Sequence, residues 1–163
     1  MAKPLFRTQG KIFGLFGLGK IGKAVVQKIS KFGFKKIIVY DPYISKTDVE
    51  VELVEFLQLL SDSDYISIHA PLTKETRHRF AKNELKVMKR TAYLINTQGA
   101  IINEKALYEA LKRGWIAVAA LDVMEKEPPY WGNPLLTTKA SRRRSRGSGT
   151  AIPLSSFFDS PHS

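Results

Sequence analysis

The sequence contains no cysteine, which excludes disulfide bonds, thiolate nucleophiles and cysteine-based metal sites. It also lacks an apolar run long enough to span a membrane, and its first residues lack the apolar core of a signal peptide. No cluster of residues has the spacing of a metal site. We therefore expect a cytoplasmic protein with no membrane partner and no metal ion.

Acidic residues are outnumbered, since 15 Asp and Glu stand against 26 Lys and Arg, for a net charge of +11. The excess is mostly spread at helical surface spacing, as at Lys20, Lys23 and Lys28, which is typical of a solvated helix face. The one true cluster is Arg142-Arg143-Arg144-Ser145-Arg146, and no aromatic residue is interleaved with it. This pattern does not favour nucleic acid as a partner.

A glycine-rich hexapeptide, Gly17-Leu18-Gly19-Lys20-Ile21-Gly22, follows an apolar run and opens a helix-like stretch. In a dinucleotide-binding unit the first glycine permits a tight turn, the second lets the backbone approach a pyrophosphate, and the third allows close helix packing. The helix N-terminus then presents N–H groups to the phosphates. A glycine triplet alone is weak evidence, because such triplets also occur in ordinary flexible loops.

Asp41 strengthens that interpretation, because it ends a second apolar run about 20 residues further on, where the dinucleotide fingerprint has an acidic residue. A carboxylate there accepts hydrogen bonds from both hydroxyls of the adenosine ribose, and it would repel a 2′-phosphate. The sequence therefore predicts NAD as the cofactor, in preference to NADP. The alternative is that Asp41 is only a turn residue before Pro42.

Strand-like and helix-like segments alternate along most of the chain. Strands are expected at residues 12–16, 36–40, 51–54, 65–69, 92–96 and 116–122, and helices at 20–32, 55–60, 83–90 and 103–113. Asn103 is the expected N-cap of the last helix, and Gly114 is expected to end it. This alternation predicts an α/β fold with a doubly wound, mostly parallel sheet.

Four polar residues, Asp41, His69, Asn96 and Asp122, lie at or just past the carboxyl ends of predicted strands. Ligands of doubly wound sheets bind at those ends. Each residue alone could instead cap a loop by bonding its backbone groups. Together with the glycine-rich turn, the four predict a cofactor cleft.

The order of these motifs resembles the D-isomer-specific 2-hydroxyacid dehydrogenases, a family that also includes NAD-binding transcriptional corepressors. The resemblance covers residues 10 to about 136. Its matching segments are Gly17–Gly22, Tyr40–Pro42, Ser63–Thr73 with Thr76, Leu94–Thr97, Glu104–Leu107 and Ala120–Pro128.

The resemblance implies a Rossmann-type NAD-binding domain and an NAD-dependent oxidoreductase that transfers hydride between NAD and a 2-hydroxy or 2-keto acid. It implies that Pro71 and Thr76 line the cofactor groove, that Asp122 bonds the nicotinamide carboxamide, and that two copies form a homodimer. The complete expected cofactor site comprises Gly17, Gly19, Lys20, Ile21, Gly22, Asp41, Pro42, His69, Pro71, Thr76, Asn96, Thr97 and Asp122.

The catalytic set that the family uses is incomplete in this sequence. Glu127 matches the glutamate that orients the catalytic histidine. Gln98 stands where the family has an arginine, in a loop one residue shorter, and an amide cannot clamp a carboxylate as a guanidinium does. The expected histidine is absent, and the Ser160-Pro161-His162 sequence is interpreted as a chance imitation of its motif. We expect the chain alone to be inactive.

Two parts are expected: an NAD-binding domain at residues 1–139 without the family's substrate-binding domain, and an irregular basic tail at residues 140–163. The tail is expected to supply no strand to the sheet, and a shifted reading frame would explain its arginine-rich start. The chain is thus interpreted as truncated at both ends. The alternative function is a non-enzymatic NAD-responsive interaction module that resembles the family's corepressors.

Overall fold

The computed structural model describes residues 8–125, 134–137 and 150–153. The elements in chain order are β1 (Ile12–Phe16), α1 (Lys20–Ile29), η1 (Ser30–Phe32), β2 (Lys36–Tyr40), β3 (Glu52–Leu53), α2 (Phe56–Asp62), β4 (Tyr65–Ile68), α3 (Lys82–Val87), β5 (Tyr93–Asn96), η2 (Gly99–Ile101), α4 (Glu104–Arg113), β6 (Val118–Leu121), α5 (Pro134–Thr137) and β7 (Thr150–Pro153). The predicted strands and helices up to β6 are all present, with ends shifted by a few residues.

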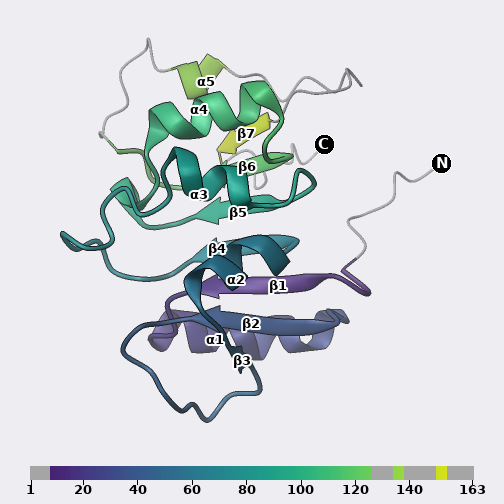
Figure 1. Ribbon diagram of the computed structural model, residues 1–163. Helices are drawn as coiled ribbons and strands as arrows, with labels where there is room; N and C mark the ends of the chain where they lie inside the picture. Colours follow the sequence, from purple (N-terminus) through teal and green to yellow (C-terminus); the bar gives the residue numbers. More distant parts are fainter. Residues whose placement is uncertain (1–7, 126–133, 138–149, 154–163) are drawn as a thin grey trace, which may run out of the picture.

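The strands form one parallel sheet in the order β3-β2-β1-β4-β5-β6-β7 (Figure 1). This confirms the doubly wound α/β prediction. The strand order reverses between β1 and β4, because the chain builds outward from β1 to β3 and then crosses back to β4. In such sheets a ligand binds outside the carboxyl ends of the strands at this reversal.

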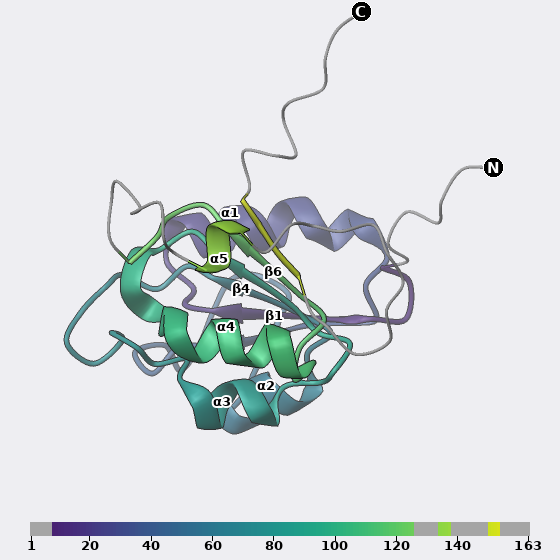
Figure 2. The ribbon, with the colours of Figure 1, turned by 90° about the horizontal axis from the view of Figure 1, so that it is seen from above.

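Helices lie on both faces of the sheet, with α1 on one face and α2, α3 and α4 on the other (Figure 2). The α1 face is packed by residues such as Phe13, Leu15 and Val26, and the opposite face by a larger buried cluster that includes Ile66, Ile68 and Leu94. Strands with apolar side chains on both faces need this double cover, which explains why their sequences are continuous apolar runs.

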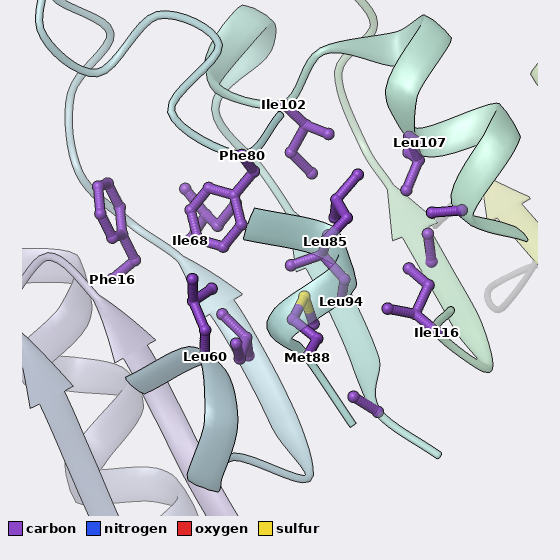
Figure 3. Packing of buried hydrophobic residues seen from close by; sticks show 14 of the residues in the cluster. Phe16, Leu60, Ile68, Phe80, Leu85, Met88, Leu94, Ile102, Leu107 and Ile116 are labelled. Carbon is purple, nitrogen blue, oxygen red and sulfur yellow. The ribbon is translucent and has the colours of Figure 1, made fainter. Parts of the chain in front are cut away.

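The larger cluster extends from the sheet centre to the loops at its carboxyl edge. Phe16 and Phe80 pack edge to face there with ring centroids 5.2 Å apart, and Leu85, Leu94 and Ile102 continue the cluster (Figure 3). Phe80 is fully buried, so the loop that carries it is anchored to the core. This anchoring positions the residues on either side of Phe80 at the ligand edge of the sheet.

The ends of helix α4 follow the predicted signals. Asn103 accepts a hydrogen bond from the Ala106 N–H at 2.9 Å, and Gly114 adopts the left-handed conformation with φ of 67°. These contacts confirm the predicted N-cap and C-terminal stop. Helix α3 is shorter than expected, because Met88 turns to an extended conformation and its side chain joins the core.

The expectation that the tail supplies no strand is wrong for Thr150–Pro153. This segment is β7, and it pairs in parallel with β6 from Val118↔Thr150 to Leu121↔Pro153. The prediction weighed the Ser, Gly and Arg content of the whole tail, whereas an exposed strand edge needs only a short segment with free backbone groups. Thr and Ile favour strands, and Pro153 is tolerated because it is the last residue of an edge strand.

Across the described part of the chain, helices are too short or too polar to cross a lipid bilayer. This finding agrees with the absence of a long apolar run in the sequence.

Candidate functional site

The glycine-rich turn leaves β1 in a conformation that requires glycine at its first position. Gly17 has a φ of +96°, and a Cβ atom there would lie 2.6 Å from the backbone nitrogen of Ala70. A Cβ atom on Gly22 would lie 2.6 Å from the carbonyl oxygen of Gly17. Gly17 therefore has the steric role of a tight-turn residue, and Gly22 permits a close approach between α1 and the Gly17 carbonyl of the turn.

The second glycine faces open space. Gly19 is the N-cap of α1 with a φ of −74°, and a Cβ atom added to it would meet no described atom within 4 Å. Lys20 and Ile21 begin the helix directly behind it. Because the first N–H groups of a helix have no partner within it, this open turn fits the phosphates of a dinucleotide.

The carboxylate of Asp41 is held against the glycine-rich turn. Its Oδ2 atom accepts a hydrogen bond from the Leu18 N–H at 2.9 Å, and its Oδ1 atom accepts one from the Tyr43 N–H at 3.0 Å. The second bond is the local turn contact that the alternative interpretation expected. The first reaches from β2 to the turn after β1, so Asp41 is more than a turn residue.

A pocket of 160 Å³ opens beside Asp41. It brings together Gly17, Asp41, Pro42, Pro71 and Thr76, five of the residues predicted from the sequence. Its full lining is Phe16, Gly17, Tyr40, Asp41, Pro42, Tyr43, Ala70, Pro71, Thr73, Glu75, Thr76 and Arg79. We call this pocket, with the Gly17–Gly22 turn, the glycine-turn end of the cleft.

The loop after β4 is shaped by two threonines. Thr76 Oγ1 donates to the Pro71 carbonyl at 2.7 Å and accepts from the Thr73 N–H at 2.7 Å. Thr73 Oγ1 in turn accepts from the Thr76 N–H at 3.2 Å. These bonds close the loop on itself, so Pro71 and Thr76 form a defined wall of the pocket.

His69 lies at the strand-order reversal, directly after β4. Its backbone N–H donates to the Phe16 carbonyl at 2.8 Å, and its Nε2 atom lies 2.8 Å from Ser67 Oγ. Nδ1 is buried and has no hydrogen-bond partner among the described residues. Burial lowers the pKa of His69 below its ordinary value of 6.5, because the imidazolium form loses solvation there.

The segment after β5 uses its polar groups internally. Asn96 is 1% exposed, its Oδ1 atom accepts from the Gln98 N–H at 3.0 Å, and its Nδ2 atom donates to the Gly99 carbonyl at 2.9 Å. Thr97 Oγ1 donates to the Ile68 carbonyl at 3.1 Å. The Asn96 side chain thus acts as a loop scaffold, which is the alternative that the sequence left open for each strand-end residue.

Asp122 follows β6 and is exposed, and its N–H donates to the Asn96 carbonyl at 2.9 Å. Asn96, Thr97 and Asp122 therefore lie together, on the far side of β4 from Asp41. We call them, with Gln98 and Glu125, the β5–β6 end of the cleft. Glu127 and His162 fall outside the described residues.

One contact at the β5–β6 end was not predicted. His78 Nε2 lies 2.6 Å from Glu125 Oε1, and an Arg77 nitrogen lies 3.4 Å from the same oxygen. His78 has a φ of 53°, the one positive value found for a non-glycine residue in the described ranges. The pairing ties the loop after β4 to the segment after β6, and no local sequence signal connects residues so distant in the chain.

The sequence also missed Arg79, which lines the same pocket as Asp41 although it lies far away in the chain. Asp41 has no arginine close to it in sequence, so Arg79 becomes its neighbour only through the fold. The guanidinium of Arg79 lies 4.1 Å from the centroid of the ring of Phe56, the first residue of α2. The sequence gave no functional signal at Phe56, because an apolar residue at the start of a helix is normally a core residue.

Comparison with known proteins gives a consistent result. The family model for the "D-isomer specific 2-hydroxyacid dehydrogenase, NAD binding domain" matches residues 2–141. A D-3-phosphoglycerate dehydrogenase of Methanocaldococcus jannaschii is 50% identical over 133 residues, which is 78% of this chain and 25% of that protein. A glyoxylate reductase of Korarchaeum cryptofilum is 48% identical over 136 residues, which is 80% of this chain and 40% of the reductase. The chain thus spans well under half the length of these relatives.

A solved structure shows the same arrangement. The NAD-dependent formate dehydrogenase from Staphylococcus aureus in complex with NAD superimposes with a TM-score of 0.79 at 34% identity, covering 90% of this chain and 41% of that one. Sequence and structure therefore agree that the chain belongs to the D-isomer-specific 2-hydroxyacid dehydrogenases, whose NAD-binding domain it represents.

Proposed function

We propose that this chain holds NAD with its adenosine half at the glycine-turn end and its nicotinamide half at the β5–β6 end. In this arrangement the Gly17–Gly22 turn and the N-terminus of α1 bind the pyrophosphate, with Lys20 and Ile21 in the first helical turn. Pro42, Pro71 and Thr76 line the adenosine pocket. His69 lies between the ends, and Asn96, Thr97 and Asp122 support the nicotinamide.

The observation that carries this proposal is the position of Asp41. Its carboxylate lies at the glycine-rich turn and lines the pocket that Gly17, Pro71 and Thr76 also line. A carboxylate in this place accepts ribose hydroxyls and disfavours a 2′-phosphate, because the two groups carry the same charge. The open space at Gly19 supports the proposal, because a ligand backbone can approach there without meeting a side chain.

We further propose that the whole protein transfers hydride between NAD and a 2-hydroxy or 2-keto acid. NAD supplies the hydride acceptor when bound, and the chain's own residues bind and orient the reactants. Glu127 is the candidate for orienting a histidine, whereas Gln98 offers a neutral amide at the position that would hold a substrate carboxylate. A small 2-hydroxy acid and a second copy of the chain are the proposed partners.

The test is a calorimetric titration of the purified chain with NAD and NADP. NAD should bind more tightly, and Asp41→Ala should weaken NAD binding by about 10-fold to 100-fold, because bonds to a charged acceptor are lost. Asp41→Asn keeps a side-chain oxygen that can accept from the Leu18 N–H of the turn. It should still show much of the loss of NAD affinity, since it removes the charge.

The control is Asp48→Ala, because Asp48 is an exposed aspartate paired with Lys23 and does not line the pocket. It should leave NAD binding unchanged. Equal or tighter binding of NADP by the unmodified chain would refute the proposed role of Asp41.

A further inference from the structure

We infer that Arg79 is an adenine-binding residue that stacks its guanidinium plane on the adenine ring of the cofactor. This inference rests on the proposed function, because it assigns a residue to the adenosine pocket of the same site. It goes beyond that function, since neither the glycine-rich motif nor the acidic residue at Asp41 involves this arginine.

The first observation is the contact that the guanidinium makes with an aromatic ring. Arg79 Cζ lies 4.1 Å from the centroid of the Phe56 ring, in the geometry of a cation–π contact. Phe56 is itself buried, with 6% of its surface exposed. The guanidinium is thus placed on a ring that belongs to the core, and it is not a freely moving surface charge.

The second observation is the rigidity of that ring. Phe56 packs edge to face against Phe16 and Phe80, each with centroids 5.5 Å apart, and its centroid lies 5.3 Å from that of Tyr40. Phe16 and Tyr40 also line the pocket. The aromatic cluster that fixes Phe56 therefore also forms part of the pocket lining, which couples the position of Arg79 to the shape of the pocket.

The third observation is that Arg79 lines the pocket together with Asp41. A guanidinium has two flat faces, and arginine stacks its plane on aromatic rings. The Phe56 ring lies against the guanidinium, 4.1 Å from Cζ. Because Arg79 also lines the pocket, a planar ligand bound there can meet the guanidinium on the side away from Phe56, so that ring, cation and base form three layers.

The remaining lining favours a base over a second phosphate as the occupant. Pro42, Ala70 and Pro71 are apolar walls, as suits a heteroaromatic ring. Asp41 carries a negative charge in the same pocket, so a phosphate drawn toward Arg79 would be repelled by the carboxylate. Arg79 therefore contributes to binding mainly through the flat face of its guanidinium and less through its charge.

The experiment uses the full chain and three variants, Arg79→Met, Arg79→Lys and Lys74→Met, titrated calorimetrically with NAD, ADP-ribose, NADP and nicotinamide mononucleotide. Arg79→Met removes the plane and the charge but keeps an unbranched apolar stem. Arg79→Lys keeps only the charge. Lys74→Met is the matched control, because it removes one positive charge from the same loop at a residue that does not line the pocket.

We expect Arg79→Met and Arg79→Lys each to weaken NAD and ADP-ribose binding by about fivefold to tenfold, as expected for loss of a partly desolvated stacking contact. Binding of nicotinamide mononucleotide, which has no adenine, should stay within twofold, as should every ligand with Lys74→Met. Thermal unfolding verifies that each variant is folded, and Arg79→Lys serves as the test if Arg79→Met is not.

Unchanged ADP-ribose affinity in both Arg79 variants would overturn the inference. Full ADP-ribose affinity in Arg79→Lys, together with a loss in Arg79→Met, would assign the effect to the charge and not to the plane. A larger loss of affinity for NADP than for NAD would also overturn it. Failure of the unmodified chain to bind NAD at all would instead refute the proposed function on which the inference rests.

Discussion

The two ends of the cleft differ in how their polar groups are used. At the glycine-turn end, Asp41 is fixed by two backbone N–H groups and faces a pocket, and Gly19 leaves space for a ligand. At the β5–β6 end, the Asn96 amide bonds its own loop, and Gln98 stands where a charged anchor is expected. The polar groups of the glycine-turn end are therefore directed to a pocket, whereas the Asn96 amide at the β5–β6 end is used within its own loop.

The largest expected effect is on turnover, and it tests whether the β5–β6 end lacks groups needed for catalysis. The purified chain should reduce glyoxylate, pyruvate or hydroxypyruvate at least about 10⁴-fold more slowly than a full-length relative, because Gln98 carries no charge and no histidine follows Glu127 before His162 in this sequence. The measurement is NADH oxidation followed by absorbance.

Replacing Gln98 with arginine should not restore turnover, because that change supplies an anchor for the substrate carboxylate but no histidine between Glu127 and His162. Turnover by the unmodified chain that His162→Ala abolishes would show that the tail supplies the missing acid–base group, and the contrast between the two ends would then be lost.

The next largest expected effect is on stability and NAD binding, and it tests whether the glycine-turn end depends on glycine at position 17. Gly17→Ala should lower the free energy of unfolding by about 3 kcal/mol or more, because the new Cβ atom meets Ala70 and the residue keeps a positive φ. NAD binding should fall below detection. Urea unfolding and calorimetry measure the two effects.

Gly10→Ala separates the two causes. Gly10 also has a positive φ, of +79°, but nothing lies within 4 Å of an added Cβ atom. It should cost only about 1 kcal/mol of unfolding free energy and leave NAD binding intact. A similar cost for both variants would mean that backbone strain, and not the close approach of Ala70, makes glycine necessary at position 17.

The smallest effect concerns His69, which lies between the two ends. Its pKa is lowered by burial, so the unfolded chain takes up a proton near pH 6.5 while the folded protein does so only at lower pH. Its contribution should therefore leave stability unchanged above about pH 6.5 and reduce it as the pH falls below that value.

Urea unfolding between pH 7.5 and pH 5 measures this slope, and His69→Gln should make it shallower. NMR titration of the imidazole should give a pKa below 6.5. A His69 pKa above 6.5 would contradict the burial argument and would require an anionic partner for the ring.

Much of the fold was predictable because its signals are local. Apolar runs of strand length, helical stripes, the Asn103 cap and the glycine-rich turn each depend on neighbouring residues, and each appears where it was predicted. The strand β7 was not predictable from composition, because its pairing depends on the open edge of β6 and not on the residues that surround Thr150–Pro153 in sequence.

The sequence by itself determined the doubly wound sheet, the positions of the glycine-rich turn and Asp41, the family, and the absence of an arginine at position 98. Only the tertiary structure decided that Asn96 serves its own loop, that His78 meets Glu125, and that Arg79 lies on Phe56 beside the Asp41 pocket. The reason is physical: propensity, chirality and spacing act between near neighbours in the chain, whereas these contacts join residues that become neighbours only after the sheet has assembled.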